Sequence, residues 1–306
     1  MKDILVKTRF FSSVTYSSVI FYAISLIFLF SCSQKKAEHS PMVFTSVLPH
    51  KFIIEKIAGD NFSAQVLIGE GQTAHHFSPT PGQVARLSEA VLFFRTGVEF
   101  EEAIIPKIKK TVKGLSIIDL RKNISLLQHE EEEENEHDHG HAESEYDPHI
   151  WLSPVLMKQQ ARVITTALQK IDPDQHALYE KNLSSLQSEL DSLHTMLTHV
   201  LGPFKGETFF VFHPAFGYFA REYTLVQKAV EAGGKEPSAK ALTQLIEAVK
   251  KEQVKVIFVQ PQYSRKSAEI IAQLTGCIVV PINPMPADYI QEMKQLGEIV
   301  RQSLSL

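Results

Sequence analysis

The apolar residues of the chain fall into short runs that alternate with longer amphipathic stretches. Four of these runs lie in the first part of the chain and predict strands: MVFTSV, AQVLI, VLFFRT and LSIID. The stretches between them repeat apolar residues every three or four positions, which predicts helices. Strands that alternate with helices typically form a parallel sheet with helices on both faces. We therefore expect an α/β lobe over residues 43–171.

The same alternation returns in the last third of the chain. Four further runs predict strands, TFFVFH, LVQKAV, VKVIFVQ and CIVVPI, and the first of them leads into a predicted helix with the sequence PAFGYFAREY. A second α/β lobe is thus expected over residues 203–306. Ligands of open parallel sheets bind beyond the carboxyl ends of the strands, so a cleft between the two lobes is the expected place for a site.

One long helix, residues 172–202, is predicted between the lobes. Asp172 is expected to cap it and Pro173 to occupy its first position, while Gly202 ends it. An apolar stripe with spacings of three and four runs along one face: Tyr179, Leu183, Leu186, Leu190, Leu193, Leu197 and Val200. We expect this helix to join the two lobes as a stiff spine.

The first 32 residues predict an export signal. Basic residues precede an uninterrupted apolar run, VIFYAISLIFLF, which is short for a membrane span. The run ends in LFSC, which resembles the lipobox at which bacterial lipoproteins are cleaved and acylated, here on Cys32. An uncleaved membrane anchor is the alternative. With residues 33–42 as a tether, the body is expected in the periplasm, anchored to a membrane by lipid.

Composition narrows the class of protein further. A length of 306 residues favours two domains, and a net charge of -4 offers no basic surface for nucleic acid. Only two cysteines occur. If Cys32 carries lipid, Cys277 has no partner within the chain, so no disulfide is expected and Cys277 is interpreted as a core residue.

An acidic segment, residues 129–147 in our division of the chain, interrupts the first lobe. It holds almost no apolar residue and cannot pack a core, but it contains four histidines: His129, His137, His139 and His141. One hypothesis is that this loop captures metal weakly and passes it to a tighter site. The alternative is a tolerated surface insertion whose composition keeps it soluble.

Three other histidines have stiff settings beside proline or aromatic residues: His75 in AHHFSPTP, His149 in YDPHIWLSP and His213 in FVFHPAFGYF. A lone histidine in such a place is more often structural than a ligand. Imidazole is, however, the commonest protein ligand of transition metals, and fixed rings suit a site whose ligands converge within about 2.1 Å of zinc. Together the three histidines predict a metal site.

Four segments carry a family resemblance: AHHFSPTPGQVARLSEAVLFFRTGVEFE, DPHIWLSP, HPAFGYFAREY and KEPSAKALTQLIEAVKKEQVKVIFVQPQYS. From about residue 43 onward the chain resembles the solute-binding proteins of bacterial zinc and manganese ABC importers (cluster A-I). The resemblance implies that His75, four residues before Pro79, is the first ligand, and that His149 and His213 are the second and third.

The fourth family position is often a carboxylate before a proline near the end of the chain, where this sequence has Asn283. The asparagine oxygen, a water, a loop carboxylate or His76 could complete the site. A neutral, nitrogen-rich site suits zinc better than manganese, and the histidine-rich insertion also resembles that of the zinc-specific members.

The resemblance implies a monomeric, non-enzymatic receptor that binds one Zn²⁺ and gives it to a membrane permease driven by a cytoplasmic ATPase. Its affinity should fall below about pH 6.5, the ordinary pKa of histidine, because only neutral imidazoles bind metal. The alternatives are a manganese receptor, a zinc-dependent hydrolase, and an adhesin or metal buffer that works without a permease. A hydrolase needs a general base, and no HExxH motif accompanies these histidines.

Overall fold

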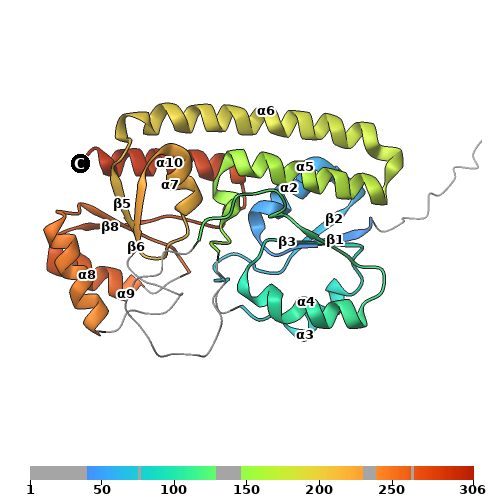
Figure 1. Cartoon of the computed structure of the whole chain (residues 1–306), viewed down its shortest axis with the longest axis horizontal. Helices are drawn as coiled ribbons and strands as arrows, with labels where there is room; N and C mark the ends of the chain where they lie inside the picture. The colour runs from blue at the N-terminus through green and yellow to red at the C-terminus, as the bar shows by residue number, and fades with distance from the viewer. Residues whose placement is uncertain (1–39, 75–76, 129–145, 230–238, 263–264) are drawn as a thin grey trace, which may run out of the picture. The chain divides into compact units, whose positions relative to one another are not determined.

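Two four-stranded parallel sheets form the framework of the chain (Figure 1). The computed structural model describes residues 40–74, 77–128, 146–229, 239–262 and 265–306. The first sheet has the order β2-β1-β3-β4 and contains β1 (Met42–Thr45), β2 (Ser63–Val66), β3 (Leu92–Arg95) and β4 (Ser116–Asp119). The second has the order β6-β5-β7-β8 and contains β5 (Thr208–Val211), β6 (Val226–Ala229), β7 (Val256–Val259) and β8 (Ile278–Pro281). The two lobes thus repeat one topology, as the apolar runs predict.

Helices connect the strands within each lobe. The first lobe contains α2 (Leu48–Ala58), α3 (Pro81–Leu87), α4 (Glu99–Thr111) and α5 (Pro154–Ile171). Figure 1 shows α3 and α4 on one side of the first sheet and α2 and α5 on the other, the arrangement expected of an α/β lobe. The second lobe contains α7 (Gly217–Tyr223), α8 (Ala239–Lys251), α9 (Arg265–Thr275) and α10 (Tyr289–Leu304).

The prediction that a helix begins at residue 214 is wrong, because α7 begins at Gly217. The N–H of Ala215 donates to the carbonyl of His213 (2.8 Å), and the N–H of Phe216 donates to the side-chain oxygen of Gln227 (2.7 Å). These hydrogen bonds keep the residues after β5 in a turn. His213 therefore lies in a loop before the helix.

The long helix α6 (His176–Leu201) lies alongside α5 and α10 (Figure 1). A 3-10 turn, Pro173–Gln175, precedes it. Asp172 does not cap the helix as predicted, because its carboxylate accepts the hydroxyl of Tyr179 (2.7 Å). The predicted stripe is buried up to Leu197, but its last member is Leu201 and not Val200.

A glycine sets the closest approach of α6 and α10. A Cβ atom added to Gly297 of α10 would lie 2.2 Å from Cδ2 of Leu197, which is fully buried. Any larger residue at position 297 would therefore force Leu197 or the two helices to shift.

A buried carboxylate organises the carboxyl ends of the central strands of the first sheet. Glu101 accepts the hydroxyl of Ser46 after β1, the N–H groups of Thr96 and Gly97 after β3, and Nε of Arg95. Burial raises the pKa of Glu101, while these hydrogen bonds and the charge of Arg95 act in the opposite direction. The network fixes the loops that follow β1 and β3.

Residues 40–306 form one compact unit. Cys277 is a buried free cysteine, as its apolar surroundings predict. Among the helices of the described residues, none combines the length and the hydropathy that a membrane span needs.

Candidate metal centre

His149 lies in a short segment whose backbone folds around Asp147. The carboxylate oxygen Oδ1 of Asp147 accepts both the backbone N–H (2.8 Å) and the ring nitrogen Nδ1 (2.7 Å) of His149. An ionised carboxylate only accepts hydrogen bonds, so Nδ1 carries the proton, and in the neutral ring Nε2 then carries the lone pair. A carboxylate behind a histidine in this way is the usual means of fixing the tautomer and the ring orientation of a metal ligand.

Residues from beyond α6 hold this segment in place. The hydroxyl of Tyr218 donates to the carbonyl of Asp147 (2.9 Å), and that of Tyr289 donates to the carbonyl of Trp151 (2.7 Å). Trp151, which is fully buried, donates its Nε1–H to the carbonyl of Pro284 (2.7 Å). His149 therefore precedes the long helix in sequence but is fixed by elements of the second lobe.

His213 lies just past the end of β5. The last rung of the sheet is the bond from the N–H of Phe212 to the carbonyl of Phe258 (2.7 Å). Beyond it, the side chain of Gln260 replaces the neighbouring strand as hydrogen-bond partner. Its Oε1 accepts the N–H of His213 (3.1 Å), and its Nε2 donates to the carbonyl of His213 (2.7 Å). Both backbone groups of His213 are thus satisfied while the chain turns out of the sheet.

The structure brings His149 and His213 together. Their ring centroids are 5.3 Å apart, the ring planes meet at 69°, and the indole of Trp151 lies 5.2 Å from the ring of His149. The two histidines share the wall of a cavity of about 20 Å³, which is also lined by Gln72, Thr73, Ala74, Trp151, Gln262, Pro284 and Met285. Both are almost completely buried, so a metal ion held between them would be shielded from solvent.

Asn283 lies next to this cavity and not in its wall. Its Nδ2 donates to Glu292 (2.8 Å), and its Oδ1 accepts the N–H of Met285 (3.0 Å). Asn283 instead lines a neighbouring cavity of about 290 Å³, whose wall includes Gln262 and Met285 as well. Its role as a fourth ligand stays a prediction.

The remaining predicted site residues lie outside the described part of the chain: His75, His76, His129, His137, His139, His141 and Cys32. Position 75 directly follows Ala74, which lies in the wall of the cavity. The described residues contain no group of three or more His, Cys, Asp or Glu side chains that could hold a metal ion. What the structure brings together is therefore the second and third predicted histidines.

Four other histidines of the described residues lie on helices. His50 is fully buried and its Nε2 hydrogen-bonds Oε1 of Gln160, whereas His176 and His199 are exposed on α6 and His194 is half-buried there. Burial lowers the pKa of His50 to about 4, while the hydrogen bond with Gln160 acts in the opposite direction. His50 is thus a neutral core residue.

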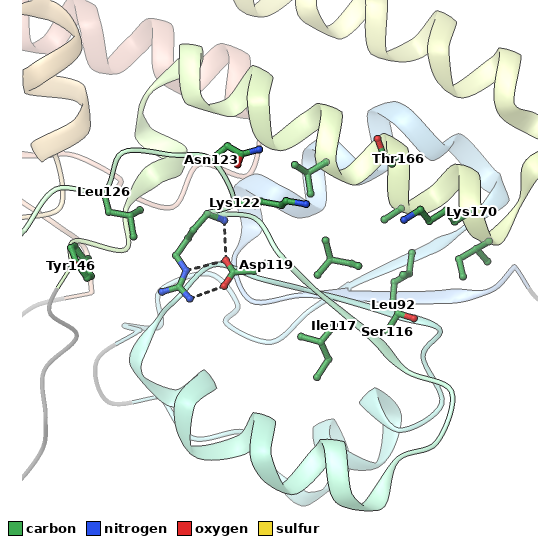
Figure 2. Close-up of a pocket in the computed structure, with 15 residues that line it drawn as sticks. Leu92, Ser116, Ile117, Asp119, Lys122, Asn123, Leu126, Tyr146, Thr166 and Lys170 are labelled. Atoms are coloured by element: carbon green, nitrogen blue, oxygen red, sulfur yellow. Dashed lines mark hydrogen bonds and ion pairs between the residues drawn. The ribbon is translucent and has the colours of Figure 1, made fainter.

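A larger cavity, of about 910 Å³, lies between β4 and α5 (Figure 2). At one end Arg121 forms a double hydrogen bond with Asp119 (3.0 and 2.7 Å), which Figure 2 marks with dashed lines. Burial alone would raise the pKa of Asp119, but the hydrogen bonds and charge of Arg121 bring it below its ordinary value. Ile117, Ile118 and Val163 supply apolar wall, and neither His149 nor His213 lines this cavity. The small cavity is therefore the candidate metal centre.

Comparison with known proteins gives a consistent match. Residues 43–302 match the family described as zinc-uptake complex component A, periplasmic (ZnuA). The high-affinity zinc uptake system protein ZnuA of Bacillus subtilis is 32% identical over 278 residues, covering 86% of this chain and 87% of that protein. A crystal structure of ZnuA matches with a TM-score of 0.79 and 35% identity over 87% of this chain and 99% of that one.

The zinc-binding lipoprotein AdcA of Streptococcus pneumoniae is 32% identical over 275 residues, which cover 88% of this chain but only 55% of AdcA. The chain thus spans about half the length of AdcA.

Proposed function

Because the chain belongs to the ZnuA family of periplasmic zinc-uptake components, we propose that it is an extracytoplasmic receptor that binds one Zn²⁺ for an ABC importer. The observation that carries the proposal is the buried pair of His149 and His213, with the Nε2 lone pair of His149 fixed by Asp147. Two imidazoles in a small, shielded cavity suit zinc better than manganese, which prefers harder oxygen ligands. His75 is the proposed third histidine ligand.

Titration calorimetry of the purified protein with Zn²⁺ tests this function. We expect tight binding of one Zn²⁺ and much weaker binding of Mn²⁺. His213→Ala should weaken zinc binding by at least ~100-fold, because a lost ligand costs more than a lost supporting residue. His199→Ala is the matched control, since His199 is exposed on α6 and should not affect binding.

Deletion of residues 129–145 separates the cavity from the acidic loop. Tight binding that survives the deletion but not His213→Ala supports a receptor with an auxiliary capture loop. Binding that disappears with the loop and ignores His213 would instead indicate a metal buffer, and the proposed site would be wrong.

We further propose that Cys32 is lipidated and holds the protein at a membrane, where it gives zinc to a permease driven by a cytoplasmic ATPase. The family description supports a periplasmic component of an uptake complex. Cys32→Ser should release the protein from the membrane fraction, and deletion of the gene should impair uptake of labelled zinc and growth under zinc limitation. Unchanged uptake would refute the role in transport.

A further inference from the structure

The side-chain carbonyl of Gln262 is buried without a hydrogen-bond donor among the described residues, which the fold alone does not explain. Oε1 of Gln262 is buried and accepts no hydrogen bond from any group in the described part of the chain. Buried carbonyl oxygens in proteins are nearly always paired, because an unpaired one loses its interaction with water and gains nothing in return. Gln262 lies in the wall of the small cavity with His149 and His213. An electropositive partner in that cavity would satisfy the oxygen.

The chain around Gln262 is tied directly to His213. Gln260, two residues earlier, is fully buried, and its side chain makes hydrogen bonds of 3.1 and 2.7 Å with the backbone of His213. Pro261 restricts the backbone between the two glutamines. The backbones at Gln262 and His213 are therefore fixed relative to each other, as two ligands of a single ion must be.

The two other amide side chains that line these cavities already have partners. Oε1 of Gln72 accepts the N–H of Gly69 (2.8 Å). Asn283 uses its amide nitrogen for Glu292 and its oxygen for the N–H of Met285. Among the three amides, Gln262 is the one whose oxygen the structure leaves for a ligand.

We propose that Oε1 of Gln262 is an oxygen ligand of the bound Zn²⁺, beside His149 and His213. The inference rests on the proposed function and supplies a residue for the position left open by Asn283. Zinc accepts protein oxygen ligands as well as imidazole nitrogens. An amide oxygen adds no charge, so the carboxylate of Asp147 behind His149 is the nearest anionic support that the described contacts show.

The test replaces Gln262 by methionine, which has a similar length but no carbonyl oxygen. Gln262→Met should weaken Zn²⁺ binding by ~10-fold or more in competition with a chelator, which is the scale of a weak ligand or a supporting group. It should also change the visible absorption of the Co²⁺-loaded protein, which reports the ligand set. The thermal midpoint of the metal-free protein should stay the same or rise, because an unpaired buried oxygen is removed.

A purely structural role for Gln262 would give the opposite pattern: a lower midpoint without metal, with unchanged zinc affinity and Co²⁺ absorption. That result would overturn the inference. Gln262→Glu restores an oxygen and should recover zinc binding while strengthening the binding of Mn²⁺, which prefers oxygen ligands. Failure of the glutamate variant to bind zinc better than the methionine variant would also count against Gln262.

Asn283→Ala is the matched comparison, since both side chains are amides near the same cavity. If Gln262 is the oxygen ligand, Asn283→Ala should weaken zinc binding less than Gln262→Met does. If Asn283→Ala weakens binding and Gln262→Met does not, Asn283 is the oxygen ligand and the inference is wrong. His213→Ala distinguishes the two proposals: if it abolishes binding while Gln262→Met does not, only the inference fails. If the unchanged protein binds no zinc, the proposed function fails as well.

Discussion

Asp147 shows how much of the metal centre depends on a single carboxylate. Its Oδ1 fixes His149, while Oδ2 lies so close to the start of α7 that a Cβ atom added to Gly217 would be 2.9 Å away. Glycine at position 217 thus leaves room for the carboxylate. Asp147 connects the two histidine segments at the level of individual atoms.

Gly217→Ala should therefore weaken zinc binding without removing a ligand. The new methyl group pushes Asp147 away from Nδ1 of His149, and the loss of such a supporting contact typically costs about 10-fold to 100-fold in metal affinity. Gly82→Ala is the control, because the nearest atom to its Cβ is 4.0 Å away. Calorimetry with Zn²⁺ measures both variants. Equal affinities would show that the position of Asp147 does not limit binding.

His50 makes the fold sensitive to acid independently of metal. Its Nδ1 is buried and has no hydrogen-bond partner in the described residues, so the folded protein disfavours protonation, with a pKa of about 4 against the ordinary 6.5. The unfolded chain binds the proton more readily, so His50 stabilises the fold above pH 6.5 and this contribution is lost as the pH falls toward 4. The full difference corresponds to roughly 3 kcal/mol of unfolding free energy.

Urea unfolding at pH 7 and pH 5 in the presence of a chelator measures this effect. His50→Gln should lower the stability at both values but make its pH dependence shallower. His176→Gln, at an exposed position on α6, should keep the dependence of the unchanged protein. The explanation is wrong if the two variants respond equally to pH.

Among the elements, α6 and α10 form a contact whose tightness can be measured. Gly297→Ala should destabilise the protein by about 1–2 kcal/mol, because overpacking against Leu197 costs about 1–3 kcal/mol and the better helix propensity of alanine returns up to about 1 kcal/mol. Denaturant unfolding gives the value. Gly202→Ala, with no atom within 4 Å of its Cβ, should be neutral or stabilising.

A double-mutant cycle shows whether the clash is the cause. Leu197→Ala alone should destabilise by leaving a cavity. In the Leu197→Ala, Gly297→Ala double variant the added methyl group occupies part of that cavity, so the total loss should be smaller than the sum of the single losses. Strict additivity would contradict the proposed contact.

The strands could be predicted because parallel strands are buried on both faces and read as continuous apolar runs. Most helices could be predicted because each buries one face, which leaves a period in the sequence. The errors occur where a distant side chain decides the local structure. The side chain of Gln227 in β6 accepts the N–H of Phe216, so α7 begins later than predicted. The hydroxyl of Tyr179 donates to Asp172, so this carboxylate does not cap the helix. Such bonds depend on which strand or turn lies next to which, and periodicity does not contain that information.

The same reason separates the predicted site residues from those that were missed. His149 and His213 are conspicuous because proline and aromatic residues surround them. Gln260 is not, because its role depends on the pairing of β5 with β7, and it contacts His213 across 47 positions of the chain. The sequence QPQ at the end of an apolar run was a signal only in combination with that pairing. Gln262 was missed for the same reason.

In the whole molecule, the two lobes contribute unequally to the metal centre. Apart from Asp147, the supports of the His149 segment and of His213 come from residues after α6, namely Tyr218, Gln260, Pro284 and Tyr289. The first lobe adds the wall formed by Gln72, Thr73 and Ala74.

The hydrogen bonds of Trp151 with Pro284 and Tyr289 also bear on when the candidate site can form during synthesis of the chain. Trp151 leaves the ribosome well before Pro284 and Tyr289, the partners of its indole and carbonyl, which lie 133 and 138 positions further along the chain. Until α10 begins to emerge, the indole and the carbonyl of Trp151 lack these partners, so the segment that carries His149 lacks part of its support. We therefore expect a chain truncated before α10 to carry both histidines without these supports, and so without the proposed tight zinc site.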